Sequence, residues 1–168
     1  MADPGREGES PGPFGSNGPA SQAEPRGPLA SPGFWLHHAA LSWRQLFDRR
    51  LRPLNLTPTQ FMLLAAAGWL AASAGQPPTQ QEVADHAGAD RMMTSKVLQT
   101  LVDRGLVQRE PDPADGRMKR LRLTPGGREL GRRGIRIAVD LDEEIFGADG
   151  DPLRETFERI AARARATF

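Results

Sequence analysis

Cysteine and tyrosine are both absent from the 168 residues, and each absence removes a class of chemistry. Without cysteine the chain forms no disulfide, ligates no zinc through thiolates and carries no thiol nucleophile or cysteine redox switch. Without tyrosine it has no phenol for acid catalysis. No apolar run approaches the roughly 20 residues that cross a bilayer, and no segment resembles a signal peptide. We therefore expect a soluble cytoplasmic protein with no membrane partner.

An excess of charge of one sign is also missing, because 22 Lys and Arg residues face 21 Asp and Glu residues and leave a net charge of +1. Bulk charge therefore does not indicate a nucleic-acid binder, and any basic surface must be local. The sequence contains no P-loop, no dinucleotide-binding glycine pattern and no convincing Ser/His/Asp order, so we expect neither an enzyme nor a cofactor. The adjacent His37 and His38 point about 100° apart on a helix, and we expect no metal site.

Glycine, proline and serine are concentrated in residues 1–30, where Phe14 and Leu29 are the only large apolar side chains. Such a segment cannot bury enough surface to offset the entropy of ordering it. We expect a disordered tail over residues 1–30 and a single domain over residues 31–168.

Helix-capping signals and apolar spacing divide the domain into six helices and one hairpin. Gly75–Pro78, Gly88 and Gly105 separate the helices, and turn residues fill 111–116. The predicted fold is mainly α with a small β-hairpin. The expected helices cover 32–52, 58–74, 79–87, 90–104, 125–145 and 151–168, and the expected strands cover 106–109 and 117–123.

A short helix, a tight turn, a longer helix and a hairpin follow one another in residues 79–123, which is the order of a winged helix-turn-helix. Helical-wheel arithmetic turns Thr94, Val97, Leu98 and Leu101 of the longer helix toward the core. The opposite face has polar and sulfur-containing side chains that suit base edges and phosphates. This outward face consists of Met92, Lys96, Gln99 and Asp103, with Ser95 beside them.

Basic residues gather in the hairpin, where Arg117 stands at the tip and Lys119, Arg120 and Arg122 follow. An arginine at such a tip suits a narrow minor groove, where the negative potential is concentrated. Asp115 can hold the Arg117 guanidinium through a bidentate pair. A local basic surface is therefore predicted on a chain whose charges otherwise balance.

Several ordered segments together resemble the MarR family of bacterial transcription regulators over residues 33–168. The resemblance implies a homodimer, usually a repressor, that binds pseudo-palindromic double-stranded DNA with its long helix in the major groove and its wing in the minor groove. It implies a DNA-binding lobe over 57–124 and dimerisation helices over 31–52 and 125–168. The segments that carry it are 83–88, 90–98, 101–107, 115–117 and 123–127.

The resemblance also assigns roles to individual residues of the lobe. Thr79 and Gln80 begin the bracing helix, and Asp115 and Arg117 form the wing pair. Independently of the resemblance, the basic pattern of the hairpin makes Lys119 and Arg120 further candidate DNA contacts. The reading helix contributes Arg91, Met92, Ser95, Lys96 and Gln99.

Apolar stripes agree with dimerising helices and run along Leu36–Leu51, Leu130–Ile145 and Leu153–Phe168. The acidic cluster 140–144 lies at the end of a helix, where the helix dipole disfavours it, and we expect it to pair with arginines of a neighbouring helix.

Many family members bind small aromatic effectors where the dimerising helices meet the DNA-binding lobe. The residues that suit such a site here are Trp35, His38, Ser42, Met62 and Trp69. A dimer core with one exposed histidine is the alternative interpretation of the same residues. For the whole chain, the alternative function is a winged-helix protein–protein module that binds an acidic partner without specific DNA binding.

Overall fold

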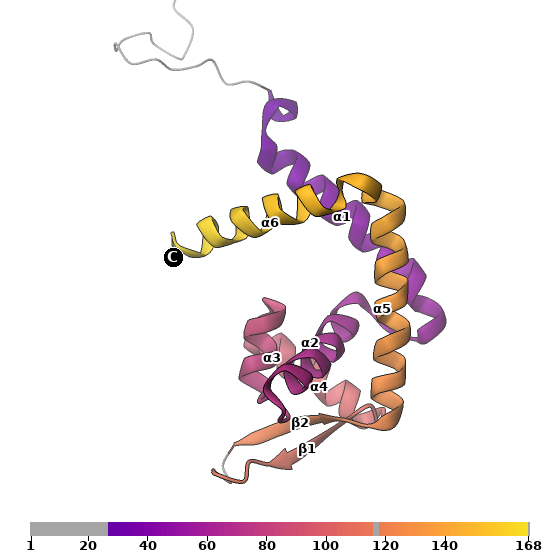
Figure 1. Cartoon of the computed structure of the whole chain (residues 1–168), viewed down its shortest axis with the longest axis vertical. Helices are drawn as coiled ribbons and strands as arrows, with labels where there is room; N and C mark the ends of the chain where they lie inside the picture. Colours follow the sequence, from indigo (N-terminus) through magenta and orange to yellow (C-terminus); the bar gives the residue numbers. More distant parts are fainter. Residues whose placement is uncertain (1–26, 116–117, 168) are drawn as a thin grey trace, which may run out of the picture. The chain divides into compact units, whose positions relative to one another are not determined.

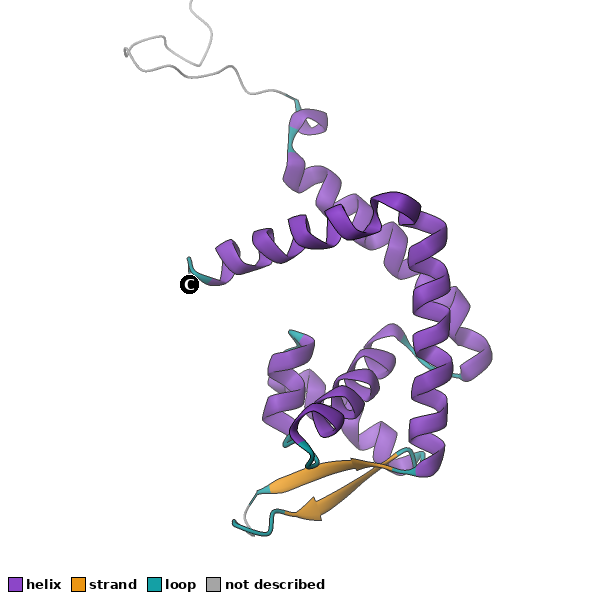
Figure 2. Cartoon of the chain, viewed as in Figure 1, coloured by secondary structure: helices purple, strands orange, loops and turns teal. Residues whose placement is uncertain are grey.

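The computed structural model describes residues 27–115 and 118–167, which form a mainly helical chain with a two-stranded hairpin (Figure 2). The described part of the chain divides after His38 into two units. The predicted fold class is confirmed. The elements are η1 Pro28–Ala30, α1 Pro32–Leu51, η2 Arg52–Leu54, α2 Pro58–Ala74, α3 Gln80–Ala87, α4 Arg91–Asp103, β1 Val107–Pro111, β2 Lys119–Leu123, α5 Pro125–Phe146, η3 Gly147–Asp149 and α6 Gly150–Arg165.

The predicted tail lies mostly outside the described residues, which begin at Gly27. Its last residues form η1, in which the Ser31 amide donates to the Pro28 carbonyl at 3.0 Å. The first unit continues into the first two turns of α1.

Side-chain caps start the helices of the second unit where the sequence predicts them. Thr57 caps α2 and Thr79 caps α3, each through a capping box with the residue three positions later. Thr124 caps α5 by accepting a hydrogen bond from the Gly127 amide at 3.0 Å. Because each cap satisfies amides that have no partner inside the helix, these positions fix where the helices begin.

Helix α2 is the centre of the second unit and contacts α3, α4, α5 and β2 (Figure 1). Phe61, Leu63 and Leu64 are buried, as expected for a helix that is apolar on nearly every face. Helix α5 approaches α2 closely because residue 134 is glycine, where an added Cβ would lie 2.5 Å from the Phe61 ring. The core therefore fixes α3, α4 and the hairpin around one buried helix.

Some residues of the first two apolar stripes pack within the chain itself. Phe47 and Leu51 of α1 and Leu141 of α5 are fully buried in the chain's own core. Ile145, at the end of the α5 stripe, is 45% exposed. The stripe spacing predicted packing correctly, but periodicity does not say which helix supplies the partner.

Polar contacts join the ends of α1 and α5 within the second unit. Glu144 forms an ion pair with Arg50, and Trp43 donates its indole N–H to Asp142 at 3.0 Å. The predicted pairing of the acidic cluster with a neighbouring arginine is confirmed for Glu144. Across the described ranges, none of the helices is long and apolar enough to cross a membrane.

Candidate nucleic-acid interface

A tight turn joins α3 to α4. Gly88 ends α3 with φ +61°, a conformation that favours glycine, and its amide donates to the Asp85 carbonyl at 3.2 Å. Asp90 then caps α4 by accepting from the amides of Met92 and Met93, both at 2.9 Å. The turn and the cap together fix the angle at which α4 leaves α3.

The two faces of α4 separate as the sequence predicts. Thr94, Leu98 and Leu101 are fully buried, and Val97 is half-buried. The other face carries Met92, which is 74% exposed, and further exposed or half-buried polar side chains. These are Arg91, Ser95, Lys96, Gln99 and Asp103. Helix α4 thus offers a polar face with two cations while its opposite face fills the core.

Gln99 lies in a chain of hydrogen bonds that links α4 to β1. Its amide nitrogen donates to Asp103 Oδ1 at 2.7 Å, and its oxygen accepts from Arg109 Nη1 at 3.0 Å. Arg109 was not predicted as part of this site, because its contact with Gln99 depends on how the hairpin folds back beside α4. The amide of Gln99 is therefore held in one orientation, with one N–H and one oxygen lone pair still available.

The hairpin pairs Val107 with Leu123 and Glu110 with Arg120 in antiparallel register. Val107, Leu121 and Leu123 turn inward and are buried, so the strands are anchored on the core by alternate residues. Lys119 is exposed where β2 begins. The predicted tip residue Arg117 lies outside the described residues, whereas its predicted partner Asp115 is exposed.

An ion pair crosses the outer face of the hairpin. Arg122 Nε donates to Glu110 Oε1 at 2.7 Å, and both side chains are partly exposed. The hydrogen bond from Arg122 holds the pKa of Glu110 below its usual value, so the pair is charged at neutral pH. Arg122 is therefore partly neutralised within the hairpin.

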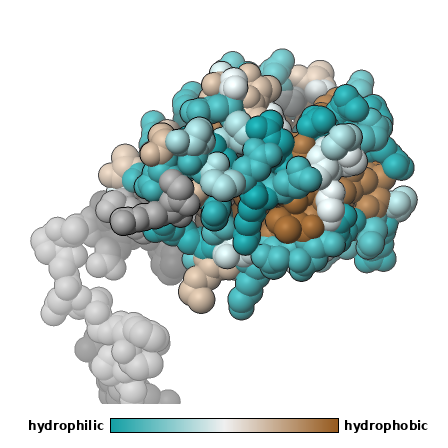
Figure 3. Space-filling model, turned by 90° about the horizontal axis from the view of Figure 1, so that it is seen from below, coloured by the Kyte–Doolittle hydropathy of each residue, from teal (hydrophilic) through white to brown (hydrophobic). Residues whose placement is uncertain are grey.

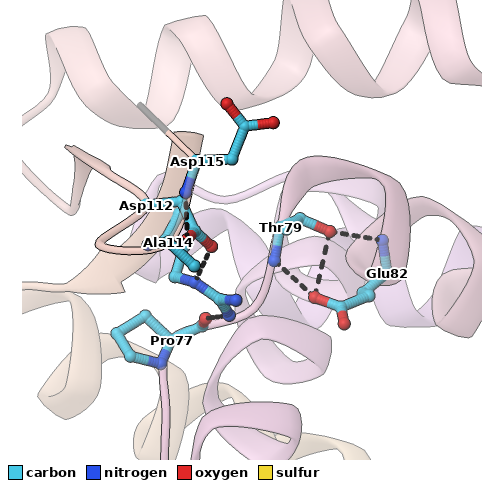
Figure 4. A network of polar contacts seen from close by, with 7 residues as sticks. Pro77, Thr79, Glu82, Asp112, Ala114 and Asp115 are labelled. Carbon is cyan, nitrogen blue, oxygen red and sulfur yellow. Dashed lines mark hydrogen bonds and ion pairs between the residues drawn. The ribbon is translucent and has the colours of Figure 1, made fainter. Parts of the chain in front are cut away.

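Arg120 differs from the other cations of the hairpin because its guanidinium turns inward. Its Nε donates to Asp112 Oδ2 at 2.5 Å and its Nη1 donates to the Pro77 carbonyl at 2.7 Å (Figure 4). Asp112 is buried, and its other oxygen accepts from the amides of Ala114 and Asp115. Asp112 was predicted only as a turn residue, since its arginine partner is eight positions away in the sequence.

The N-terminus of α3 is capped by the side chains of Thr79 and Glu82. The Thr79 hydroxyl accepts from the Glu82 amide at 3.2 Å and donates to Glu82 Oε2 at 2.9 Å, which also accepts from the Thr79 amide (Figure 4). Thr79 is 8% exposed, whereas Gln80 is half-buried. Thr79 therefore fixes this turn, and Gln80 is the more accessible of the two.

The predicted effector residues fall in both units. In the first unit, Trp35 is 55% exposed and donates its indole N–H to the Leu29 carbonyl at 2.8 Å, and the His38 ring packs on Phe34 at 4.2 Å. In the second unit, Ser42 and Met62 are exposed. The remaining residue of the set, Trp69, stacks on His86 of α3 with ring centroids 4.7 Å apart.

A groove of about 570 Å³ lies between α2, β2 and α5, and Trp69 lines it. Leu121 and Gly131 form part of its apolar lining, and Arg128 and Arg132 are at its polar side. Within residues 27–115 and 118–167, no three His, Asp or Glu side chains gather as metal ligands would. The groove therefore suits an apolar molecule with a negative group better than a metal ion.

From the side where the hairpin lies, the surface is mainly hydrophilic, with one hydrophobic patch set into it (Figure 3). A braced helix with an exposed polar face, followed by a hairpin that bears cations, defines a winged helix-turn-helix protein. The comparisons with known proteins specify this class further.

Residues 54–118 match the model of the MarR family. An uncharacterised helix-turn-helix-type transcriptional regulator of Bacillus subtilis, YdcH, is 34% identical over 122 residues, which are 73% of this chain and 82% of that protein. The chain belongs to the MarR family of transcriptional regulators, whose members are not enzymes.

Solved structures of this family resemble the chain over most of its length. The transcriptional repressor CouR bound to a 23-mer DNA duplex is 31% identical, with a TM-score of 0.69, and the match covers 80% of this chain and 96% of CouR. CouR of Rhodococcus jostii RHA1 bound to p-coumaroyl-CoA matches with 25% identity and a TM-score of 0.69, over 80% of this chain and 94% of that one. These relatives support a DNA-binding regulator and not the alternative of a protein–protein module.

Proposed function

We propose that two copies of the chain bind one DNA duplex at a pseudo-palindromic operator and repress transcription there, in the bacterial cytoplasm. The observation that carries the proposal is the division of α4 into two faces, because Thr94, Leu98 and Leu101 are fully buried on one face while Met92, Lys96 and Gln99 are exposed on the other. A helix held in this way can enter a major groove without disturbing the fold. The DNA-bound CouR relative supports the choice of duplex DNA.

Individual roles follow from side-chain chemistry. In this proposal Gln99 reads an adenine edge, Met92 contacts a thymine methyl group and Lys96 neutralises a phosphate or reads guanine. Arg91 and Ser95 contact the backbone beside the groove. Gln80 approaches a phosphate at the start of α3, where Thr79 holds the turn in place.

The wing completes the contact in this proposal. Arg117 enters the adjacent minor groove, Asp115 orients it, and Lys119 binds a phosphate. The roles of Asp115 and Arg117 rest on the sequence pattern, and the role of Lys119 is supported by its exposure at the start of β2.

Exposed apolar side chains on α5 and α6 support the homodimer. No described residue of α6 is buried within the chain, and Phe157 and Ile160 are 41% and 45% exposed. Val139 of α5 is 57% exposed. A second copy would remove these surfaces from water, as symmetric interfaces commonly do.

Selection of bound duplexes from a random DNA pool tests the proposal. We expect an inverted repeat whose half-sites are about one helical turn, roughly 10 base pairs, apart. Recovery of no preferred sequence at physiological salt would remove sequence-specific DNA binding.

Lys96→Ala then tests the helix assignment on the selected duplex. Because the proposed dimer has two copies of Lys96, the loss of one phosphate contact in each subunit should lower the slope of log affinity against log salt by about 1.8, which is about 0.9 for each contact. Arg163→Ala removes one exposed charge from α6 and serves as the matched control, for which we expect an unchanged slope. Equal slopes for wild type and Lys96→Ala would exclude Lys96 from phosphate contact.

We also propose that an aromatic carboxylate or a related anionic aromatic molecule binds the groove between α2, β2 and α5 and releases the DNA. Trp69 offers a ring for stacking, and Arg128 and Arg132 line the same groove. Arg132 is paired with Glu129 and Arg128 donates to the Leu123 carbonyl, so in this proposal Arg128 is the main source of positive charge for the ligand. The relative bound to p-coumaroyl-CoA, a thioester that combines an aromatic ring with negatively charged phosphates, supports a ligand that is both aromatic and anionic.

Fluorescence anisotropy of the DNA complex during titration with salicylate, and with larger aromatic acids, tests this second proposal. We expect release of the duplex by at least one of these compounds, and loss of that response in Trp69→Ala while its DNA affinity is retained. Indifference to the whole panel would overturn the ligand proposal and leave the DNA proposal intact.

A further inference from the structure

The guanidinium of Arg120 is occupied within the chain, although the residue belongs to the basic strand of the hairpin. Its side chain is 17% exposed, compared with 52% for Arg122 two residues later. Two of its N–H groups reach Asp112 Oδ2 and the Pro77 carbonyl. Its side chain is therefore directed toward the protein and away from the solvent in which DNA would lie.

Asp112 connects this arginine to the turn of the hairpin. Its side chain is 4% exposed, and Oδ1 accepts from the amides of Ala114 at 2.7 Å and Asp115 at 3.1 Å. These hydrogen bonds, first from Ala114 and then from Asp115, together with that from Arg120, hold the pKa of Asp112 below its usual value. One ionised carboxylate thus holds both the turn and the Arg120 side chain.

The other end of the network lies on the segment that joins α2 to α3. The Leu121 amide donates to the Pro78 carbonyl at 2.7 Å, and Thr79 forms an isolated antiparallel bridge with Arg120. Thr79 also caps α3. Strand β2 is therefore attached, next to the Arg120 contact, to the residue at which the bracing helix begins (Figure 4).

We propose that Asp112 and Arg120 are positioning residues, which fix the hairpin against the start of α3 so that the wing and α4 meet the same duplex, and that Arg120 itself does not neutralise a phosphate. This inference rests on the proposed function, because it assumes that the hairpin touches DNA. It reassigns Arg120, which the sequence pattern placed among the DNA contacts.

The direction in which DNA affinity changes when a charge is removed distinguishes a residue that positions the hairpin from one that contacts DNA directly. Removing a negative charge near a polyanion ordinarily strengthens binding, since electrostatic repulsion decreases. Loss of the Asp112 carboxylate should instead weaken binding, because the hairpin turn and Arg120 lose their shared partner. An arginine that neutralised a phosphate would lower the salt slope by about 0.9 in each subunit when removed, or about 1.8 for the proposed dimer, whereas a positioning arginine leaves the slope unchanged.

The test uses the full chain and a duplex enriched by it from a random pool, with affinities measured by anisotropy at several salt concentrations. We expect Asp112→Asn and Arg120→Lys each to weaken binding by about tenfold, because neither replacement restores the hydrogen bonds of the pair. The double variant should be no weaker than the weaker single variant. Arg122→Ala is the matched control on the same strand, for which we expect a smaller change.

Thermal unfolding of each variant, and amide exchange at Ala114, Asp115 and Leu121 in the free protein, complete the experiment. We expect cooperative unfolding with faster exchange at these three amides. Tighter binding by Asp112→Asn, or a salt slope lowered by about 1.8 for the dimer in Arg120→Ala, would overturn the inference. If the wild-type protein selects no duplex, the proposed function fails. Unchanged amide exchange in the variants would separately show that Asp112 and Arg120 do not fix the hairpin against the start of α3.

Discussion

At the scale of the residue, Thr94 lies on the buried side of α4 with a hydroxyl group that has no hydrogen-bond partner among the described residues. A buried polar group without a partner destabilises the fold, because it has lost its hydrogen bonds to water. Thr94→Val keeps the side-chain shape and removes the hydroxyl. We expect the free energy of unfolding to rise by about 1 kcal/mol, measured by chemical denaturation, with unchanged DNA affinity.

Thr100 of the same helix provides the control for that prediction. Its exposed hydroxyl donates to the Lys96 carbonyl at 3.2 Å, so Thr100→Val should leave stability within about 0.5 kcal/mol of wild type. A Thr94→Val variant less stable than wild type would show that the hydroxyl has a role that the structure does not reveal.

Residues of the candidate site were predictable from the sequence when their environment is set by local periodicity. The buried Leu98 and the exposed Lys96 follow from a spacing of about 100° per residue. The pairing of Gln99 with Arg109 and of Asp112 with Arg120 was not predicted. Both contacts join positions eight or more residues apart, and they depend on the register of the hairpin, which no local pattern specifies.

At the scale of the element, the junction between β2 and α5 depends on a glycine. An added Cβ at residue 127 would lie 2.0 Å from the Leu106 carbonyl oxygen, which also accepts from the Thr124 amide. Gly127→Ala must therefore displace either β1 or the first turn of α5. We expect the free energy of unfolding to fall by roughly 1–3 kcal/mol in a denaturant titration.

Gly126→Ala is a matched control for this prediction. The nearest atom to a Cβ at residue 126 is the Thr124 hydroxyl oxygen, at an ordinary contact distance of 3.8 Å. Since alanine favours helices by about 1 kcal/mol over glycine, this variant should be as stable as wild type or more stable. Equal stability of the two variants would show that Gly127 is not constrained by the Leu106 carbonyl.

Helix starts were more predictable than strand ends. The caps at Thr57, Thr79 and Thr124 mark the observed starts of α2, α3 and α5, because the cap is a local hydrogen bond. The first strand was predicted to end at Arg109 but continues to Pro111, which pairs with Lys119. Turn residues indicated an earlier end, whereas pairing with β2 extends the strand.

At the scale of the whole molecule, a net charge of +1 gives little long-range attraction to DNA. Affinity must then come from the few cations placed at the surface of α4 and the hairpin. Two copies would double these contacts on one duplex and make the second half-site an intramolecular partner. Tight binding to DNA would therefore depend most on the proposed dimer.

The last helix supplies the test of that dependence. Phe157 is 41% exposed on α6, so Phe157→Glu should fold as a single chain but place a charge in the proposed interface. We expect the dimer dissociation constant to rise at least about tenfold in sedimentation experiments, and affinity for an inverted-repeat duplex to fall with it. Ala162→Glu adds the same charge on the opposite side of α6 and should change neither measurement. Dimers of unaltered affinity in Phe157→Glu would show that subunits pair through another surface, because an unpaired carboxylate cannot be buried in an apolar contact without weakening it.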